Sequence, residues 1–211
     1  MRPHVTINAA ISVDGKIALA DGRGVRISDE EDLRRVHALR ASCDAILVGV
    51  GTVLTDDPKL TVKAEYAKGP NPLRVVLDSD GKTPGRAHVL DGTAPTLIAT
   101  AADCERTFRT ADVFRAGSDE VDLEALLGHL SDRGVKSLLV EGGSTVIWSF
   151  LRGRLADELK VFVGSRVLGG QSAPTLAGGE GAKSLEDAIR LRLDRAGRLG
   201  SGVLLEYTVV P

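Results

Sequence analysis

The stretch AILVGVGTVLTDDPKLTV, residues 45–62, decides the fold that the sequence predicts. Its apolar run 45–50 reaches a glycine-bearing corner, the polar segment TDDP follows, and a short alternating run comes last. A short apolar run between turn signals is typical of a strand buried on both faces, as the strands of parallel sheets are. Thr52, Asp56 and Asp57 therefore follow a buried strand, where the loops of an open parallel sheet converge on ligands.

Similar apolar runs recur along the chain and alternate with helical patterns. Strands are predicted at 4–11, 73–79, 96–100, 136–142 and 158–168. Helices are predicted at 28–40, 122–134 and 143–151; in the first, Ser28 and Glu31 form a capping box, and Gly134 ends the second. Alternating strands and helices favour an α/β fold with a largely parallel sheet.

The tail departs from this alternation. Residues 188–210 alternate apolar and polar side chains around a glycine-rich turn, which predicts an antiparallel hairpin at a sheet edge. No internal repeat or low-complexity segment divides the chain. The prediction is one domain over residues 1–211, with a mostly parallel central sheet flanked by helices and a C-terminal antiparallel hairpin.

Composition limits the classes of function. The 211 residues are 43% hydrophobic, enough for one sizeable core, and the formal net charge of -2 gives no nucleic-acid-binding footprint. The apolar runs are too short to cross a bilayer, and Asp14 comes too early for a signal peptide. Cys43 and Cys104 are isolated from each other, which favours a reducing, cytoplasmic location.

The segment EGGST, residues 141–145, is the most suggestive motif. Two glycines before a predicted helix let the backbone approach a ligand closely, and a helix N-terminus offers unpaired N–H groups to a phosphate. Glycines at such a turn also serve steric needs alone, and Asp56-Asp57-Pro58 by itself reads as a turn. The four histidines are scattered, so no metal site is predicted.

Longer segments carry a resemblance to a known family. SVDGKIA (12–18), RVHALRASCDAILVGVGTVLTDDPKLTV (35–62), NPLRVVLDS (71–79), LLVEGGST (138–145) and DELKVFVGSRVLGGQSAPT (157–175) resemble the reductases of riboflavin biosynthesis. That family includes stand-alone archaeal and fungal enzymes and the reductase half of a bifunctional bacterial deaminase/reductase. The resemblance implies a dihydrofolate-reductase-like fold, a homodimer, and NADPH as cofactor, with NADH as an alternative.

The resemblance also assigns roles to single residues. Arg40, Leu60, Lys63 and Glu141 match substrate positions, with Arg40 and Lys63 at the substrate's 5′-phosphate. The cofactor positions that match are Thr52, Asp56, Ser79, Gly142, Gly143, Ser144 and Thr145. The implied reaction passes a hydride from the nicotinamide to ribose C1′ of a ribosylamino-pyrimidinone 5′-phosphate. Glu141, Asp56 and a bound water are the candidate proton donors, and the sequence does not choose among them.

Three alternatives stay open at this point. The substrate is expected to be the 2,5-diamino compound, because the chain carries no zinc-deaminase signature and stand-alone family members reduce before deamination; the deaminated 5-amino compound is the alternative. A pterin or dihydrofolate reductase would share the fold. The alternative that is not an enzyme is a nucleotide sensor, which would bind NADPH without turnover.

Overall fold

The computed structural model describes residues 2–210 and divides them into two compact units. Unit 1 contains residues 2–4 and 37–139, and unit 2 contains residues 5–36 and 140–210. Each unit therefore draws on separate stretches of the sequence. The single domain over residues 1–211 stays a prediction.

Unit 1 is built on a parallel set of strands. They are β2 (Ala45–Gly49), β3 (Leu73–Leu77), β4 (Thr96–Thr100), β5 (Asp112–Arg115) and β6 (Ser137–Val140), with the order β5-β4-β3-β2-β6. The pairs β2–β3, β3–β4 and β4–β5 are parallel. Every residue of β2 and β4 is buried, which explains why their sequences are apolar without alternation.

Short helices cover these strands. Val53 of α2 (Val50–Asp56) and Val89 of the 3₁₀ helix η1 (His88–Leu90) pack in one cluster with Ile46, Val76 and Ile98 of the strands. Helix α3 (Leu123–Asp132) buries a separate row of leucines, Leu126, Leu127 and Leu130. Burial of this apolar area stabilises the unit by roughly 25 cal/mol per Å² removed from water.

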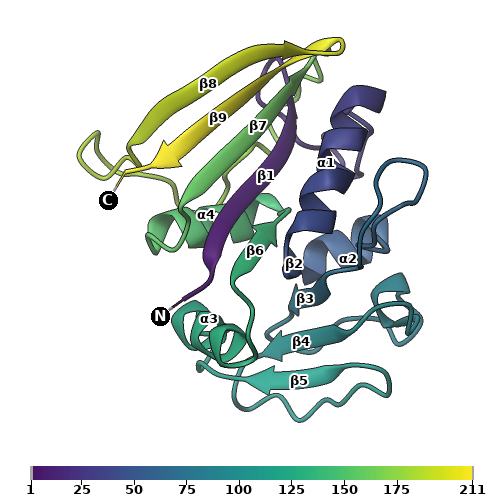
Figure 1. Cartoon of the computed structure of the whole chain (residues 1–211). Coiled ribbons are helices and arrows are strands. Elements are labelled where there is room, and N and C mark those ends of the chain that lie inside the picture. The colour runs from purple at the N-terminus through teal and green to yellow at the C-terminus, as the bar shows by residue number, and fades with distance from the viewer. Residues whose placement is uncertain (1, 211) are drawn as a thin grey trace. The chain divides into compact units, whose positions relative to one another are not determined.

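Unit 2 combines a parallel strand pair with the C-terminal hairpin (Figure 1). Its strands are β1 (His4–Ser12), β7 (Glu158–Gly164), β8 (Leu191–Leu199) and β9 (Gly202–Val209), in the order β1-β7-β9-β8. Strand β7 is parallel to β1 and antiparallel to β9. Helix α4 (Ser144–Arg152) follows β6, and α1 (Glu30–Ser42) begins in unit 2 and ends in unit 1.

The predicted fold class is confirmed: the strands are mostly parallel, helices flank them, and the tail is an antiparallel hairpin. The predicted capping box is wrong. Asp29, not Ser28, accepts the hydrogen bond from the Asp32 amide at 2.9 Å, and Glu31 instead accepts one from the Gly200 amide. The long-range contact with Gly200 is invisible in the local sequence.

The corner after the strand at 45–50 is also different from the prediction. The chain enters α2 at Val50, directly from β2, so TDDP is in part the last turn of a helix. Strand β5 and helix η1 had no predicted counterpart. No helix in residues 2–210 is both long enough and apolar enough to span a membrane.

Candidate functional site

Helix α2 carries the first two predicted cofactor residues. Thr52 and Asp56 are four residues apart on this helix, so their side chains lie on the same face. The helix starts where β2 ends, and Asp57 closes it in the left-handed region (φ 41°), with its amide donating to the Val53 carbonyl at 3.2 Å. The sequence motif thus places a hydroxyl and a carboxylate together at the end of a buried strand.

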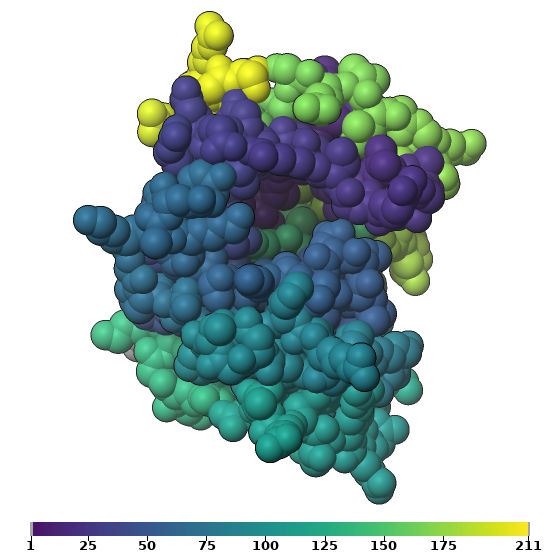
Figure 2. Space-filling view, turned by 90° about the vertical axis from the view of Figure 1, so that its right-hand side faces the viewer, coloured from purple at the N-terminus to yellow at the C-terminus, as the bar shows by residue number. Residues whose placement is uncertain are grey.

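The loop after α2 carries Leu60. Its backbone is left-handed (φ 52°) and only 2% of the residue is exposed, because its side chain packs in the core cluster of unit 1. Little of Leu60 is therefore open to a ligand. In Figure 2 the blue residues of α2 and this loop lie against the teal residues that follow β3, in line with the hydrogen bond from the His88 amide to Asp57.

The predicted phosphate residues Arg40 and Lys63 come from α1 and from the same loop. Arg40 Nη1 donates to the Thr61 carbonyl at 3.3 Å, and the Lys63 amide donates to His37 Nδ1 at 3.2 Å. The Lys63 ammonium lies 5.7 Å above the Tyr66 ring and 3.9 Å from Glu65, and its side chain is 60% exposed. The last turns of α1 thus fix the backbone of residues 61–63 and bring both cations to one region of unit 1.

Ser79 follows β3, as predicted. Its hydroxyl accepts a hydrogen bond from the Val121 amide at 3.3 Å. The turn after it is held by the buried Asp78, whose carboxylate accepts from the amides of Lys82 and Thr83 at 2.7 Å each. Lys82 forms an exposed ion pair with Asp80, and that partner raises the pKa of Lys82. The buried Asp78 therefore has a structural role.

Unit 2 carries the glycine motif. Glu141 and Gly142 follow β6, the peptide bond between Gly142 and Gly143 is cis, and α4 begins at Ser144. Gly143 is the N-cap of α4, and as a glycine it has no side chain that could accept a hydrogen bond from the helix amides. Gly142 has φ 106°, a conformation that a residue with a Cβ rarely adopts. The first amides of α4 are therefore not covered by a capping side chain, as expected of an anion-binding helix N-terminus.

A second glycine-rich segment, residues 175–181, packs against α4. The Gly178 amide donates to the Ser144 carbonyl at 3.1 Å, and a Cβ on Gly178 would lie 2.9 Å from Ser144 Oγ. A Cβ on Gly179 would lie 2.5 Å from Trp148 Cδ1. Sequence analysis missed this segment as a neighbour of the glycine motif; the AGGEG run at 177–181 is the signal that could have pointed to it.

Ser12 and Asp14, at the end of β1, hold another loop of unit 2. Asp14 accepts hydrogen bonds from the Ser12 hydroxyl at 2.7 Å and from the Leu168 and Gly169 amides at 3.0 and 2.7 Å. These hydrogen bonds, led by that from Ser12, lower the pKa of Asp14 to about 2. The Lys16 ammonium donates to the Ala173 carbonyl at 3.2 Å in the same region.

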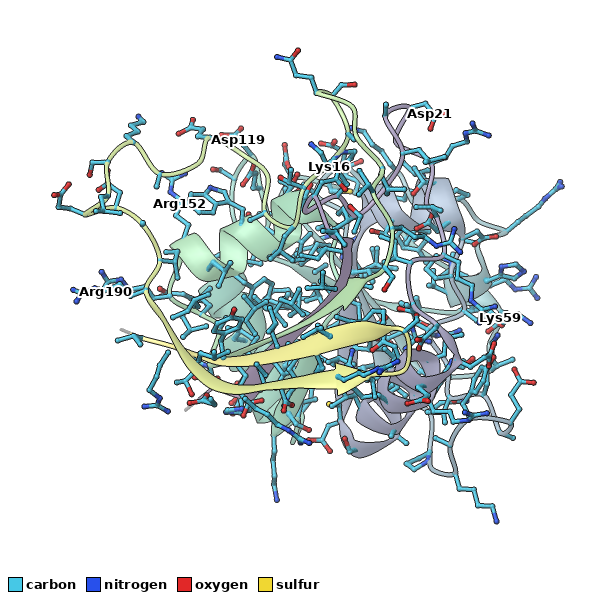
Figure 3. All side chains as sticks on the ribbon, turned by 90° about the horizontal axis from the view of Figure 1, so that it is seen from above. Lys16, Asp21, Lys59, Asp119, Arg152 and Arg190 are labelled. Carbon is cyan, nitrogen blue, oxygen red and sulfur yellow. The ribbon has the colours of Figure 1, made fainter. Side chains whose placement is uncertain are left out.

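A separate hollow of about 400 Å³ lies at the other end of α4. Side chains of both charges line it, including Arg152 and Arg190, which are labelled in Figure 3.

Within residues 2–210, no group of three or more histidine, cysteine or acidic side chains is arranged to hold a metal ion. The structure thus groups Thr52 with Asp56, Arg40 with Lys63, and Glu141 with the N-terminus of α4.

Comparison with known proteins identifies the family. A family model described as the RibD C-terminal domain matches residues 3–205. The chain belongs to this family. Its relatives include the 2,5-diamino-6-ribosylamino-4(3H)-pyrimidinone 5′-phosphate reductase of Methanothermobacter thermautotrophicus, 49% identical over 99% of both chains. A reductase of the same name from Aquifex aeolicus is 41% identical over 99% of this chain and 97% of the relative.

Solved structures agree with this assignment. The deaminase/reductase of Thermotoga maritima has a TM-score of 0.84 and 31% identity, and the match covers 99% of this chain and 57% of that one. The chain thus spans a little over half of that bifunctional protein. A dihydrofolate reductase from Enterococcus faecalis, complexed with NADP(H), has a TM-score of 0.57 at 12% identity, which shows a shared fold alone. The predicted family and the dihydrofolate-reductase-like fold are therefore confirmed.

Proposed function

We propose that this chain is an NADPH-dependent oxidoreductase of riboflavin biosynthesis. Its reaction reduces the ribosylamino group of 2,5-diamino-6-ribosylamino-4(3H)-pyrimidinone 5′-phosphate to a ribitylamino group. The observation that carries the proposal is the full-length likeness to a reductase of that name, at 49% identity over 99% of both chains. A match that leaves out almost no part of either chain favours the same reaction, not only the same fold.

The residues present fit a dinucleotide cofactor. The start of α4 has no capping side chain in the described structure, and a Cβ at Gly142 would meet only the Ile147 side chain, at 3.7 Å, so this backbone has room beside it. We assign the pyrophosphate to this helix N-terminus, with Ser144 and Thr145 in its first turn. Thr52, Asp56 and Ser79 would contact the remainder of the cofactor. When bound, NADPH supplies the hydride.

The substrate's phosphate is assigned to Arg40 and Lys63. Both are cations: the Arg40 guanidinium donates to the Thr61 carbonyl, and the backbone amide of Lys63 donates to His37. Arginine offers a planar fork of donors that matches a phosphate, while lysine adds a single charged group. Leu60 would contact the substrate only through the 2% of the residue that is exposed.

The protein must also move one proton. Hydride transfer to ribose C1′ of the opened imine leaves the imine nitrogen in need of a proton, which a positioned acid or water supplies. Glu141, between β6 and the glycine pair, and Asp56, at the last turn of α2, are the two carboxyl groups proposed for this step. A Glu141→Gln variant that loses kcat but binds substrate would assign the proton to Glu141; a normal kcat would leave Asp56 or a bound water.

The test of the proposed function is NADPH oxidation, followed by absorbance, with the diamino compound and its deaminated 5-amino counterpart side by side. We expect the higher kcat/KM with the diamino compound, because a site that accepts a hydrogen bond from the 2-amino group discriminates strongly against its loss. Preference for the deaminated compound would favour the second candidate, the activity in the name of the Thermotoga maritima relative. If the protein bound NADPH but oxidised it in the presence of neither compound, the proposal would be overturned.

We also propose a homodimer. Strand β8 is the last strand in the order β1-β7-β9-β8, and it exposes Leu193 by 53% and Leu191 by 39%. An edge strand with exposed apolar side chains is a ready surface for pairing with a second copy. Light scattering at micromolar concentration should report twice the mass of the chain, and a monomer would refute the proposal.

The isolated thiols of Cys43 and Cys104 support a cytoplasmic location.

A further inference from the structure

The largest fully buried side chain in the described residues is an arginine. Arg74 lies on β3 with 0% of its surface exposed. Removing a guanidinium charge from water is costly unless hydrogen bonds and an opposite charge compensate for it. The proposed reaction uses neither Arg74 nor its partners, so the structure has to account for this buried charge in another way.

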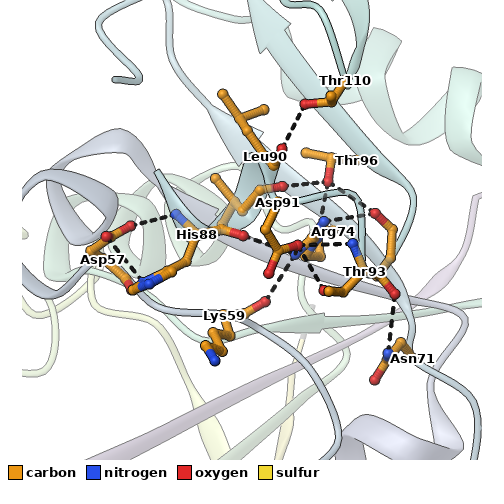
Figure 4. A network of polar contacts seen from close by, with 12 residues as sticks. Asp57, Lys59, Asn71, Arg74, His88, Leu90, Asp91, Thr93, Thr96 and Thr110 are labelled. Atoms are coloured by element: carbon orange, nitrogen blue, oxygen red, sulfur yellow. Dashed lines mark hydrogen bonds and ion pairs between the residues drawn. The ribbon is translucent and has the colours of Figure 1, made fainter. Parts of the chain in front are cut away.

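Arg74 donates hydrogen bonds to five acceptors, shown in Figure 4. Nε donates to Thr96 Oγ1 at 2.9 Å, and Nη2 donates to the Ala94 carbonyl at 2.7 Å. Nη1 donates to Asp91 Oδ1 at 2.9 Å and to the carbonyls of His88 and Lys59 at 3.1 and 3.3 Å. One side chain thus ties together β3, η1 and the loop after α2.

Asp91 is the counter-charge of Arg74. Burial raises the pKa of Asp91, but hydrogen bonds from Thr93 and Arg74 outweigh burial and hold this pKa at about 2. The carboxylate is therefore ionised across the physiological range and remains a partner for the guanidinium. The pair anchors the turn after η1.

A second group of contacts, the second tie, holds the loop after α2 at its first residue, Asp57. The His88 amide donates to Asp57 Oδ1 at 2.7 Å, and His88 Nδ1 lies 2.8 Å from the Asp57 carbonyl and 3.0 Å from its carboxylate. Both neighbours of Nδ1 are acceptors, so Nδ1 is the donor in this contact. Since the His88 carbonyl is also a partner of Arg74, the two ties share η1 (Figure 4).

The segment that the two ties hold, residues 57–60, is strained. Asp57 and Leu60 both have positive φ, at 41° and 52°. Non-glycine residues adopt this conformation only where the surrounding structure imposes it. The ties at Asp57 and Lys59 are the contacts that impose it. They fix where the backbone of Leu60 and the end of α2, with Asp56, lie.

We propose that Arg74 and His88 are positioning residues, which hold residues 57–60 in the geometry that binds the pyrimidine phosphate substrate. The inference rests on the proposed function, because Leu60 and Lys63 take their substrate roles from it. Arg74 is fully buried, and the His88 ring is held against Asp57, so we assign both an action through the loop and not a contact with the substrate. Loosening either tie should raise KM for the substrate more than it weakens NADPH binding, because the pyrophosphate is assigned to the start of α4 and not to residues 57–60.

Three substitutions at His88 give the sharpest test, because this side chain is 51% exposed and its loss leaves the core intact. His88→Asn keeps an N–H donor at the position of Nδ1, whereas His88→Gln moves the donor one atom outward and His88→Ala removes it. We expect kcat/KM to fall roughly 2- to 12-fold for the alanine and glutamine variants, the range for one hydrogen bond. The asparagine variant should stay close to wild type.

Arg74→Lys tests the larger tie. A lysine keeps the charge but cannot supply the donors that five acceptors require. We expect at least a 10-fold fall in kcat/KM, with faster amide hydrogen exchange over residues 57–63. Arg115→Lys is the matched control, since Arg115 also bridges two backbone carbonyls of unit 1, those of Cys104 and Arg106, at a distance from this loop in the sequence.

The outcomes separate the inference from the proposed function. Positioning would be supported by a kcat/KM close to wild type in His88→Asn, a loss in His88→Gln and His88→Ala, and faster amide hydrogen exchange over residues 57–63 in Arg74→Lys. Wild-type kcat/KM in the alanine variant, or equal losses in all three His88 variants, would overturn it while leaving the reductase activity in place. A wild-type protein that fails to reduce either pyrimidine phosphate would overturn the proposed function itself, and with it this inference. If Arg74→Lys does not fold, the His88 series still decides.

Discussion

Replacing Gly179 by alanine tests how the segment 175–181 packs on α4. Gly179 has φ +76°, and a Cβ there would lie 2.5 Å from Cδ1 and 3.1 Å from Nε1 of Trp148. Gly181 is a matched control, because its φ is +71° and a Cβ there would have no atom within 4 Å. The two substitutions therefore carry the same backbone penalty and differ in the contact with the indole ring.

The expected magnitudes follow from this difference. Alanine in the left-handed region costs about 1–2 kcal/mol, of which roughly 0.4–1 is recovered because the unfolded chain loses freedom. The overlap with Trp148 adds about 1–3 kcal/mol. We expect the free energy of unfolding to fall by about 1 kcal/mol in Gly181→Ala and about 3 kcal/mol in Gly179→Ala. In a chain of this size these values correspond to losses in Tm of about 2–4 °C and 6–12 °C.

Trp148 is the only tryptophan in the sequence, so its fluorescence reports this contact directly. We expect the emission maximum to shift in Gly179→Ala and to stay unchanged in Gly181→Ala. NADPH binding should weaken only in the first variant, because the same segment contacts Ser144 at the start of α4. Equal losses of stability in the two variants, or an unchanged emission maximum in Gly179→Ala, would refute the described packing.

Three further predictions concern the proposed ligands and the response to pH. Arg40→Ala should raise the substrate KM about 10- to 150-fold, as expected for loss of a charge-assisted hydrogen bond of roughly 1.5–3 kcal/mol, and should leave NADPH binding nearly unchanged. An equal loss on a dephosphorylated substrate would show that Arg40 is structural. Gly143→Val should weaken NADPH binding, measured by fluorescence titration, because a branched side chain would stand where the pyrophosphate is assigned; unchanged affinity in a folded variant would remove this loop from the site. Asp14 has its pKa lowered from 3.8 to about 2 in the folded protein, so its contribution to stability is present above pH 4 and lost as pH falls through 2. Acid titration of Asp14→Asn should show a flatter loss of stability in that window, and a profile identical to wild type would contradict the role given to this carboxylate.

The strands were predictable because burial on both faces leaves a plain signal. In β2 and β4 every residue is buried, and both appear in the sequence as uninterrupted apolar runs bounded by turns. Strand β5 was missed because its residues are half-buried or exposed, so DVFR shows no such run. Helix α2 was missed for another reason: it is one short helix that follows a strand with no intervening loop, and its glycine suggested a corner.

The candidate site divides in the same way. The glycine motif before α4 was predictable because its signal lies within five consecutive residues, 141–145. The support beneath the loop 57–60 was not, because Arg74 reaches partners 14 to 22 residues away along the chain. In the sequence, Arg74 is one charged residue inside an apolar strand, and nothing local shows which carbonyls it will meet.

The two phosphate-binding regions proposed for this protein depend on different kinds of interaction. At the start of α4 the donors are backbone amides, whose positions are set by the helix itself and whose dipole does not titrate. Around Arg40 and Lys63 the donors are long side chains; the Arg40 guanidinium donates to the Thr61 carbonyl, while Lys63 is held through its backbone amide by His37. A long side chain loses more conformational entropy on binding than a helix amide does. The substrate region therefore depends more heavily on the scaffold beneath it, and unit 1 supplies that scaffold through a fully buried arginine.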